Sequence, residues 1–167
     1  GKEGSNAPHP PPPPHLNHPQ PCAHTCTRNR DTTALVGMSS KSFTGTIPTE
    51  YGRLTKLTSF DLKRNSLNGT LPSELGQLSA MSSYFYLYSN ELTGSLPTQL
   101  GQMSLLSGSL DVSLNSVSGS LPTQIGRLGL LDHLKLHQNA ISGSLPTQIG
   151  GGSHLLALRL NANKLSG

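Results

Sequence analysis

The stretch Leu121 to Ser144, LPTQIGRLGLLDHLKLHQNAISGS, recurs with small changes along most of this chain. Its proline has counterparts at steps of 24, 25, 25 and 24 residues, namely Pro48, Pro72, Pro97, Pro122 and Pro146. Its asparagine recurs at steps of 25, 25, 24 and 24 residues, namely Asn65, Asn90, Asn115, Asn139 and Asn163. A fixed period of this length is typical of a solenoid, in which each repeat packs only on its neighbours.

The first part of the stretch, residues 121 to 126, predicts a short helical or 3₁₀ segment. Pro122 fixes its entry, Thr123 is placed to cap it, and Gly126 supplies a permissive backbone at its exit. Leu134 and Leu136 stand two residues apart, which predicts a short strand with its other side chains on the opposite face.

The recurring asparagine follows each predicted strand. Its side-chain amide can satisfy backbone groups that the turn exposes. We therefore expect a buried structural ladder formed by Asn65, Asn90, Asn115, Asn139 and Asn163.

Two neighbouring repeats carry one extra residue. Met81 to Phe85 and Leu106 to Leu110 are four steps, whereas Leu57 to Phe60 is three. The insertion predicts a local bulge just before the strand, with the register preserved after it.

The chain divides into three parts. Residues 1–21 hold eight of the thirteen prolines and predict an extended, disordered linker, with a PxxP docking site or a weak metal site as alternatives. Residues 22–45 predict an N-terminal cap and a degenerate first repeat, in which Val36 and Met38 stand where Phe60 and Leu62 fall. Residues 46–167 predict five repeats of 24–25 residues, the last one incomplete.

Composition excludes several classes of function. A hydrophobic content of 33% suits a solenoid with a narrow core, and a net charge of +4 without a dense basic run disfavours nucleic-acid binding. No apolar run approaches the roughly 18 residues that span a bilayer, so we expect no membrane insertion by this segment. No signal peptide is visible, and because the chain starts at Gly1 we interpret it as a mature piece or fragment.

Cys22 and Cys26 lie together just before the repeats, which favours a local disulfide in an oxidising compartment. Asn68-Gly69-Thr70 makes Asn68 a candidate for N-glycosylation in that compartment, although the same tripeptide also fits the repeat pattern. The histidines and cysteines lack the paired spacing of zinc sites, so we predict neither a metal nor a cofactor.

The repeats read LxxLxLxxNxLxGxLP, as from Leu54 to Pro72 and from Leu128 to Pro146. This pattern, with its LPxxLG or LPxxIG element, resembles the plant-type leucine-rich repeats of receptor-kinase ectodomains and polygalacturonase-inhibiting proteins. The resemblance implies an α/β fold: a leucine-rich repeat solenoid, a short right-handed horseshoe with a concave parallel β-sheet and a convex side of 3₁₀ segments and loops. It also implies a secreted or cell-surface protein.

Strand alternation predicts which side chains the concave sheet presents to a ligand. Three of the four tyrosines fall in one repeat, and tyrosine is enriched at interfaces, although it is also favoured in strands for packing alone. The predicted ligand-binding residues are Asp61, Lys63, Tyr84, Tyr86, Tyr88, Asp111, Leu114, Lys135, His137 and Arg159. We expect a non-catalytic module that binds a protein, peptide or glycan, with the oligomeric state left open.

Two other functions compete with this interpretation. Rows of Thr and Ser beside the turn glycines predict an ice-binding or cell-wall structural solenoid as an alternative; one row is Thr46, Thr70, Ser95, Ser120 and Ser144. An enzyme is disfavoured, because Asp111, Asp132, His133 and His137 share an open sheet and no catalytic motif occurs.

Overall fold

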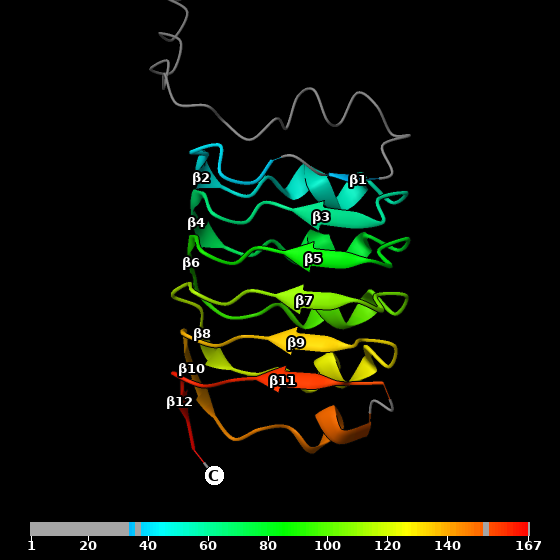
Figure 1. Ribbon diagram of the computed structural model, residues 1–167, viewed down its shortest axis with the longest axis vertical. Coiled ribbons are helices and arrows are strands. Elements are labelled where there is room, and N and C mark those ends of the chain that lie inside the picture. Colours follow the sequence, from blue (N-terminus) through cyan, green and yellow to red (C-terminus); the bar gives the residue numbers. More distant parts are fainter. Residues whose placement is uncertain (1–33, 36–37, 152–153, 167) are drawn as a thin grey trace, which may run out of the picture.

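The computed structural model describes residues 34–35, 38–151 and 154–166. Each repeat forms one coil, and the coils stack along the long axis of the molecule (Figure 1). One face carries a parallel six-stranded sheet in the order β1-β3-β5-β7-β9-β11. Its strands are β1 (Ala34–Leu35), β3 (Ser59–Asp61), β5 (Tyr84–Tyr86), β7 (Ser109–Asp111), β9 (His133–Lys135) and β11 (Ala157–Arg159). The predicted solenoid with a parallel sheet is confirmed.

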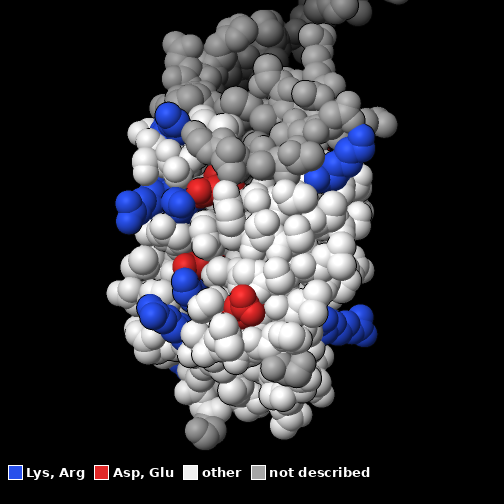
Figure 2. Space-filling model, turned by 45° about the vertical axis from the view of Figure 1, so that its right-hand side comes forward, with Lys and Arg blue, Asp and Glu red and all other residues white. Residues whose placement is uncertain are grey.

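The six-stranded sheet separates the core from an outer face, which we call the open face. The middle residue of each strand points inward, and Phe60, Phe85 and Leu110 are partners in register and fully buried. The flanking residues of each strand point the other way, because side chains alternate along a strand. Much of the surface seen in Figure 2 carries no charge. Because the strands are in register, the outward side chains of successive strands lie in rows on the open face.

A second set of strands lies at the side of the stack in two three-stranded sheets, β2-β4-β6 and β8-β10-β12. Their strands are β2 (Thr44–Thr46), β4 (Ser66–Thr70), β6 (Glu91–Thr93), β8 (Ser118–Ser120), β10 (Ala140–Gly143) and β12 (Lys164–Leu165). Thr46 pairs with Asn68, and Thr70 pairs with Thr93. The predicted row that placed Thr46 beside Thr70 is therefore wrong in register, because pairing in these sheets shifts by two residues from coil to coil.

The convex side carries one short 3₁₀ helix per coil. These helices are η1 (Thr49–Arg53), η2 (Ser73–Gln77), η3 (Thr98–Gln102), η4 (Thr123–Arg127) and η5 (Thr147–Gly151). The N-cap of η4 is Pro122, with extended backbone and no side-chain cap bond, so the prediction that Thr123 caps it is wrong. The Thr123 hydroxyl instead donates to Gln124 Oε1 at 3.3 Å. The proline sets the extended backbone before the helix.

The glycine near the end of each of the helices η1 to η4 is required by close packing between coils, whereas a Cβ at Gly150 in η5 would meet nothing within 4 Å. A Cβ added at Gly126 would lie 2.4 Å from the carbonyl oxygen of Gln148 in the next coil, and one at Gly101 would lie 2.2 Å from that of Gln124. Neither glycine has a positive φ. The predicted role of Gly126 as a permissive exit residue is therefore wrong, and the physical reason is the short distance between stacked helices.

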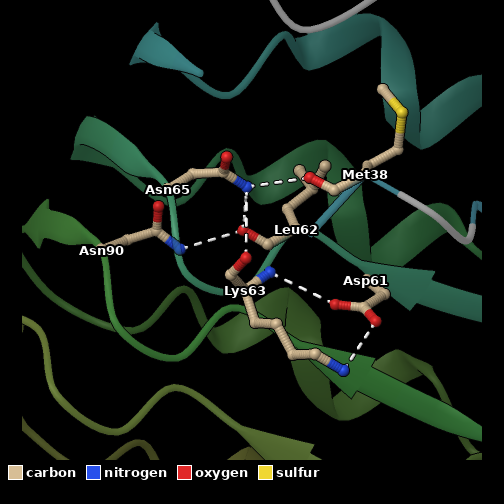
Figure 3. Close-up of polar contacts among 6 residues, drawn as sticks. All are labelled: Met38, Asp61, Leu62, Lys63, Asn65 and Asn90. Carbon is tan, nitrogen blue, oxygen red and sulfur yellow. Dashed lines mark hydrogen bonds and ion pairs between the residues drawn. The ribbon is translucent and has the colours of Figure 1, made fainter. Parts of the chain in front are cut away.

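The hydrogen bonds of the predicted asparagine ladder are present, although its side chains are half-buried and not fully buried. Asn65 Nδ2 donates to the carbonyl oxygens of Leu62 in its own coil and Met38 in the preceding one, at 2.8 and 3.0 Å (Figure 3). Its Oδ1 accepts from the backbone N–H of Phe43 at 3.1 Å. Asn90 repeats the pattern by donating to Leu62. Each asparagine thus joins two coils through backbone groups that no strand satisfies.

The extra residue in the two longer repeats forms the predicted bulge. The amides of Ser82 and Ser83 both donate to the carbonyl oxygen of Thr58, at 3.2 and 2.9 Å, so two residues oppose one. Register is restored at once, because Ser59 pairs with Tyr84. The predicted preservation of register is confirmed.

The first coil differs from prediction by one residue. Leu35, and not Val36, pairs with Phe60 in the six-stranded sheet. Met38 nevertheless supplies the carbonyl oxygen that Leu62 supplies in the next coil, as predicted, because Asn65 donates to it. The predicted linker and the two cysteines lie outside the described residues.

The residue before each ladder asparagine has left-handed backbone, which the sequence pattern did not reveal. The φ angles of Arg64, Ser89, Leu114, Gln138 and Ala162 lie between 54° and 57°. Residues other than glycine adopt this conformation at a cost of about 1–2 kcal/mol. The turn that positions the ladder asparagine imposes it.

Candidate functional site

The candidate site is the open face around β5, where three tyrosines lie in contact. The rings of Tyr84 and Tyr86 stack with centroids 4.8 Å apart, and the rings of Tyr86 and Tyr88 meet edge to face at 5.9 Å. All three side chains are half-buried. We call these three residues the tyrosine cluster. The fourth tyrosine, Tyr51, is completely buried in the core.

Lys63 connects the tyrosine cluster to the neighbouring strand. Its Nζ lies 2.9 Å from Asp61 Oδ2, 5.1 Å from the ring centre of Tyr86 and 5.8 Å from that of Tyr88. A cation over an aromatic face contributes about 0.5–1 kcal/mol at exposed sites. The hydrogen bond to Asp61 raises the pKa of Lys63 from its ordinary value. Lys63 and Asp61 therefore form a paired unit (Figure 3).

Tyr86 sits at the centre of this electrostatic arrangement. Burial raises the pKa of its hydroxyl, the Lys63 ammonium lowers it, and the Asp111 carboxylate raises it again. The net shift is upward. The Tyr86 hydroxyl is thus held neutral and available as a hydrogen-bond donor.

Asp61 and Asp111 lie on the open face, as predicted, but they do not protrude from it. They are only 7% and 6% exposed, because they stand on either side of Tyr86 in register. Asp111 Oδ1 accepts hydrogen bonds from the backbone N–H and the hydroxyl of Ser113. The expectation that both carboxylates are exposed contact residues is corrected: each forms part of the floor beside the tyrosine cluster.

The remaining predicted residues lie on the same face, toward the C-terminal coils. Lys135 on β9 is half-buried, His137 follows that strand, and Arg159 on β11 is exposed. Leu114 is 41% exposed at the end of the row that follows β7. The structure therefore brings Asp111 between the tyrosine cluster and Lys135, and places Arg159 one strand farther away.

Sequence reasoning missed the part played by two small residues in and directly after β7. Ser109 and Ser113 are 5% and 2% exposed, and they lie with Asp111 between the larger side chains of β5 and β9. The Ser109 hydroxyl is buried and has no hydrogen-bond partner in the described structure. The run Ser109-Leu110-Asp111-Val112-Ser113 carried a signal, since it puts only small or acidic side chains on the open face.

Other sequence candidates lie elsewhere. Asn68, the glycosylation candidate, is exposed in β4 at the side of the stack. No group of three or more potential metal ligands was found among the residues that the structure describes. Each 3₁₀ helix in the described part of the chain is five residues long, and no helix there has the length and hydrophobicity of a membrane span.

Comparison with known proteins identifies relatives of this architecture. A model of the leucine-rich repeat family matches residues 56–78. Comparison with curated protein sequences gave no significant match. The fold is similar to the Arabidopsis receptor kinase HAESA ectodomain, solved with a peptide hormone ligand, with 31% identity, a TM-score of 0.82, and coverage of 89% of this chain and 24% of that one.

Two further solved structures are similar. A chain of the BIR3–SERK2 complex from Arabidopsis thaliana shows 33% identity and a TM-score of 0.67, over 78% of this chain and 68% of that chain. The plant peptide hormone receptor RGFR1, solved in complex with RGF2, shows 40% identity and a TM-score of 0.71, over 74% of this chain. This chain covers 20% of the RGFR1 chain, and thus about a fifth of its length.

Proposed function

This chain belongs to the plant-type leucine-rich repeat proteins, and from that premise we propose that it is a non-catalytic recognition module of a secreted or cell-surface protein. Its ligand is a peptide, or an extended segment of a protein, that lies on the open face over the tyrosine cluster. Similar chains whose descriptions name peptide hormones, such as RGFR1 and HAESA, support this ligand class.

The observation that carries the proposal is the tyrosine cluster on the open face. Tyr84, Tyr86 and Tyr88 are half-buried and already in contact with one another, so little conformational freedom remains to be lost on binding. Tyrosine is also over-represented among residues that dominate interface energies. A preorganised cluster of this kind favours ligand contact over a purely structural role.

The ring arrangement favours a peptide over a glycan. One face of Tyr86 is stacked on Tyr84, and the Lys63 ammonium lies 5.1 Å from the Tyr86 ring centre. Flat sugar stacking needs a free aromatic face, whereas ring edges and hydroxyls suit the hydrogen-bonding groups of a peptide backbone. Because the Tyr86 ring is engaged by Tyr84 and Lys63, we take its edge and hydroxyl as the groups that the peptide contacts.

A display selection tests the proposal. A random peptide library is selected on the immobilised protein, and the affinities of enriched peptides are measured for the native protein and for the triple variant Tyr84→Ser, Tyr86→Ser and Tyr88→Ser. We expect convergent sequences whose affinity falls at least about tenfold in the variant. The matched control is Gln102→Ala in η3, on the convex side, which leaves affinity unchanged.

Two results would contradict the proposal. One is the absence of any convergent peptide, and the other is binding that the triple variant retains within about twofold while its circular dichroism spectrum stays native. The single variant Tyr86→Phe separates contributions further. It keeps the ring packing and removes the hydroxyl, so a loss of affinity assigns a ligand hydrogen bond to that group.

The candidate glycosylation of Asn68 has a separate test. Asn68 is exposed, and its sequon is available for a glycan of the secretory pathway. We expect protein expressed with a secretory leader in plant cells to carry a glycan that peptide N-glycosidase removes, and Asn68→Gln to lack it. Secreted protein without any glycan at Asn68 argues against this modification.

A further inference from the structure

The open face already binds one ammonium group of the chain itself, that of Lys63. Lys63 follows Asp61 by two residues, and its Nζ lies 2.9 Å from Asp61 Oδ2. The same Nζ lies within 6 Å of the ring centres of Tyr86 and Tyr88. A carboxylate on one strand and aromatic rings on the next thus hold one positive charge between them.

The aspartate of this arrangement recurs on the other side of β5, but the lysine does not. Asp61 and Asp111 both pair with Tyr86 in register, from β3 and from β7. In both strands the backbone N–H two residues later donates to the Oδ1 atom of the aspartate, at 3.3 Å from Lys63 and 3.0 Å from Ser113. The second aspartate therefore has the same backbone support as the first.

The two sides differ in the residue that follows the aspartate by two positions. On β3 it is Lys63, which brings the ammonium, whereas after β7 it is Ser113, whose hydroxyl donates to Oδ1. Asp111 Oδ2 has no hydrogen-bond or ion-pair partner among the described residues. A carboxylate that is 6% exposed therefore carries a charge that no cation balances directly.

A second polar group beside Asp111 is also unpartnered. Ser109 lies two residues before Asp111 on the same face of β7, and its hydroxyl is buried without a hydrogen-bond partner in the described structure. Buried hydroxyls in native proteins are almost always paired. Both groups accept hydrogen bonds, and an ammonium group offers three donors.

Lys135 is the cation of this chain that could compete for the position. It pairs with Asp111 in register from β9, yet among the described side chains it makes no ion pair with that carboxylate. Its other neighbour in register is Arg159, a like charge. Lys135 stands on the opposite side of Asp111 from the tyrosine cluster, so it does not occupy the side of Asp111 that faces Tyr86.

We propose that Asp111, Ser109 and the adjoining tyrosine cluster form a subsite for the ammonium group of a lysine side chain in the peptide ligand. This inference rests on the proposed function and adds a sequence preference to it. The bound lysine takes the position relative to Asp111 and β5 that Lys63 takes relative to Asp61 and β5. The outward neighbours of the carboxylate along the chain are the small side chains of Ser109 and Ser113, and Asp111 itself is 6% exposed.

The first experiment uses a small probe and does not depend on a peptide ligand. Nα-acetyl-lysine amide is titrated into the ¹⁵N-labelled protein, and amide shifts are followed by NMR. Nα-acetyl-norleucine amide, which keeps the alkyl chain and lacks the ammonium, is the control ligand. We expect saturable shifts at Ser109, Asp111 and Ser113 with the lysine probe, and at least about fivefold weaker binding of the norleucine probe.

Three variants sharpen the result. Asp111→Asn is expected to weaken the lysine probe at least about fivefold, and Glu74→Gln in η2, which changes net charge equally, to leave it unchanged. Lys135→Gln is expected to strengthen binding, because it removes a neighbouring positive charge. Ser113→Lys supplies an internal ammonium as Lys63 does, and is expected to abolish binding. If Asp111→Asn fails to fold, the binding of the lysine probe to Ser113→Lys decides whether the subsite exists.

The possible outcomes separate this inference from the proposed function. Equal binding of both probes, or undiminished lysine binding in Asp111→Asn and Ser113→Lys, overturns the subsite. Peptides that depend on the tyrosine cluster but show no preference for lysine also overturn it, and they leave the proposed function intact. Lysine binding that depends on Asp111, without any selected peptide, supports the subsite and contradicts the proposed function.

Discussion

The ladder asparagines show how one side chain specifies a joint between coils. Asn115 Oδ1 accepts from Leu92 N–H at 3.0 Å, and its Nδ2 donates to the carbonyl oxygens of Leu87 and Val112, both at 3.1 Å. The asparagine amide offers both donors and an acceptor in this geometry. An aspartate in the same place would lack the donors, so the residue type is determined by hydrogen-bond chemistry.

Replacing Asn115 with Ala should therefore destabilise the protein substantially. It leaves the backbone N–H of Leu92 without its acceptor, which costs about 1–3 kcal/mol. It also removes one donor each from the carbonyl oxygens of Leu87 and Val112, which keep their bonds from Asn90 and Asn139, and each lost bond costs about 0.5–1.5 kcal/mol. We expect a loss of about 3 kcal/mol in the free energy of unfolding, measured by urea denaturation. Asn68→Ala, at an exposed asparagine outside the ladder, is the control and should change stability by less than about 0.5 kcal/mol. Equal effects of the two variants would refute the ladder's role.

Alkaline pH should destabilise the fold through Tyr86 and Lys63. The pKa of Tyr86 is raised above 10.0 in the folded state by burial, so the unfolded chain loses this proton first. Stability is therefore fully present below pH 10 and falls as pH rises through the folded pKa. The pKa of Lys63 is also raised, by its hydrogen bond to Asp61, and its loss of charge above 10.5 acts in the same direction.

The contribution of Tyr86 is isolated by the variant Tyr86→Phe. We expect its melting temperature to fall less than that of the native protein between pH 8 and pH 11.5. Tyr84→Phe, for the stacked neighbour, is measured in parallel. If the melting temperatures of the native protein and of Tyr86→Phe fell equally with rising pH, burial of this hydroxyl would not affect stability.

At the scale of the element, the spacing of the 3₁₀ helices depends on glycine. Gly52, Gly76, Gly101 and Gly126 each face a backbone carbonyl of the following coil, whose oxygen lies 2.2–2.4 Å from the place that a Cβ would occupy. Backbone atoms cannot move aside as flexible side chains do. The LPxxLG element is thus a condition for stacking helix on helix.

The variant Gly101→Ala tests this requirement. Its Cβ would contact the backbone of Gln124, which must shift, and we expect a loss of at least about 2 kcal/mol in unfolding free energy. Gly129→Ala is the matched control, because a Cβ there meets nothing within 4 Å. It should be neutral or slightly stabilising. If Gly101→Ala were equally neutral, the coils would be more loosely stacked than the structure indicates.

At the scale of the molecule, apolar side chains are better buried in the middle coils than in the last described coil. Phe60 and Phe85 stack at 4.9 Å between neighbouring coils, and Tyr51 meets Phe60 edge to face at 5.7 Å. In the last described coil, Leu156 and Leu158 are 76% and 37% exposed. β11 has one strand partner, β9, within the described sheet.

In an isolated polypeptide of residues 1–167, this exposed apolar surface should promote self-association. We expect Leu156→Ser with Leu158→Thr to lower the apparent mass at high concentration, because less apolar area is available for contact. Sedimentation velocity across a concentration series measures the effect. Leu105→Ser, at an exposed leucine near η3, is the control. Unchanged association in the double variant would rule out the last coil as the contact surface.

The repeat solenoid, its parallel sheet, the asparagine ladder and the bulge before β5 were all determined by the sequence. They follow from local periodicity, since a repeat of constant length brings equivalent residues into register. The open-face position of Tyr84, Tyr86 and Tyr88 was likewise readable from strand alternation.

Only the tertiary structure decided how exposed each outward side chain is, because exposure depends on the size of the side chains in neighbouring coils. Asp61 and Asp111 occupy outward positions, yet they are buried because bulky residues flank them in register. The pairing shift of the side sheets and the Leu35 register were also invisible, because they depend on how coils stack. Alternation determines which way a side chain points, but its exposure is decided by the residues that stacking places beside it.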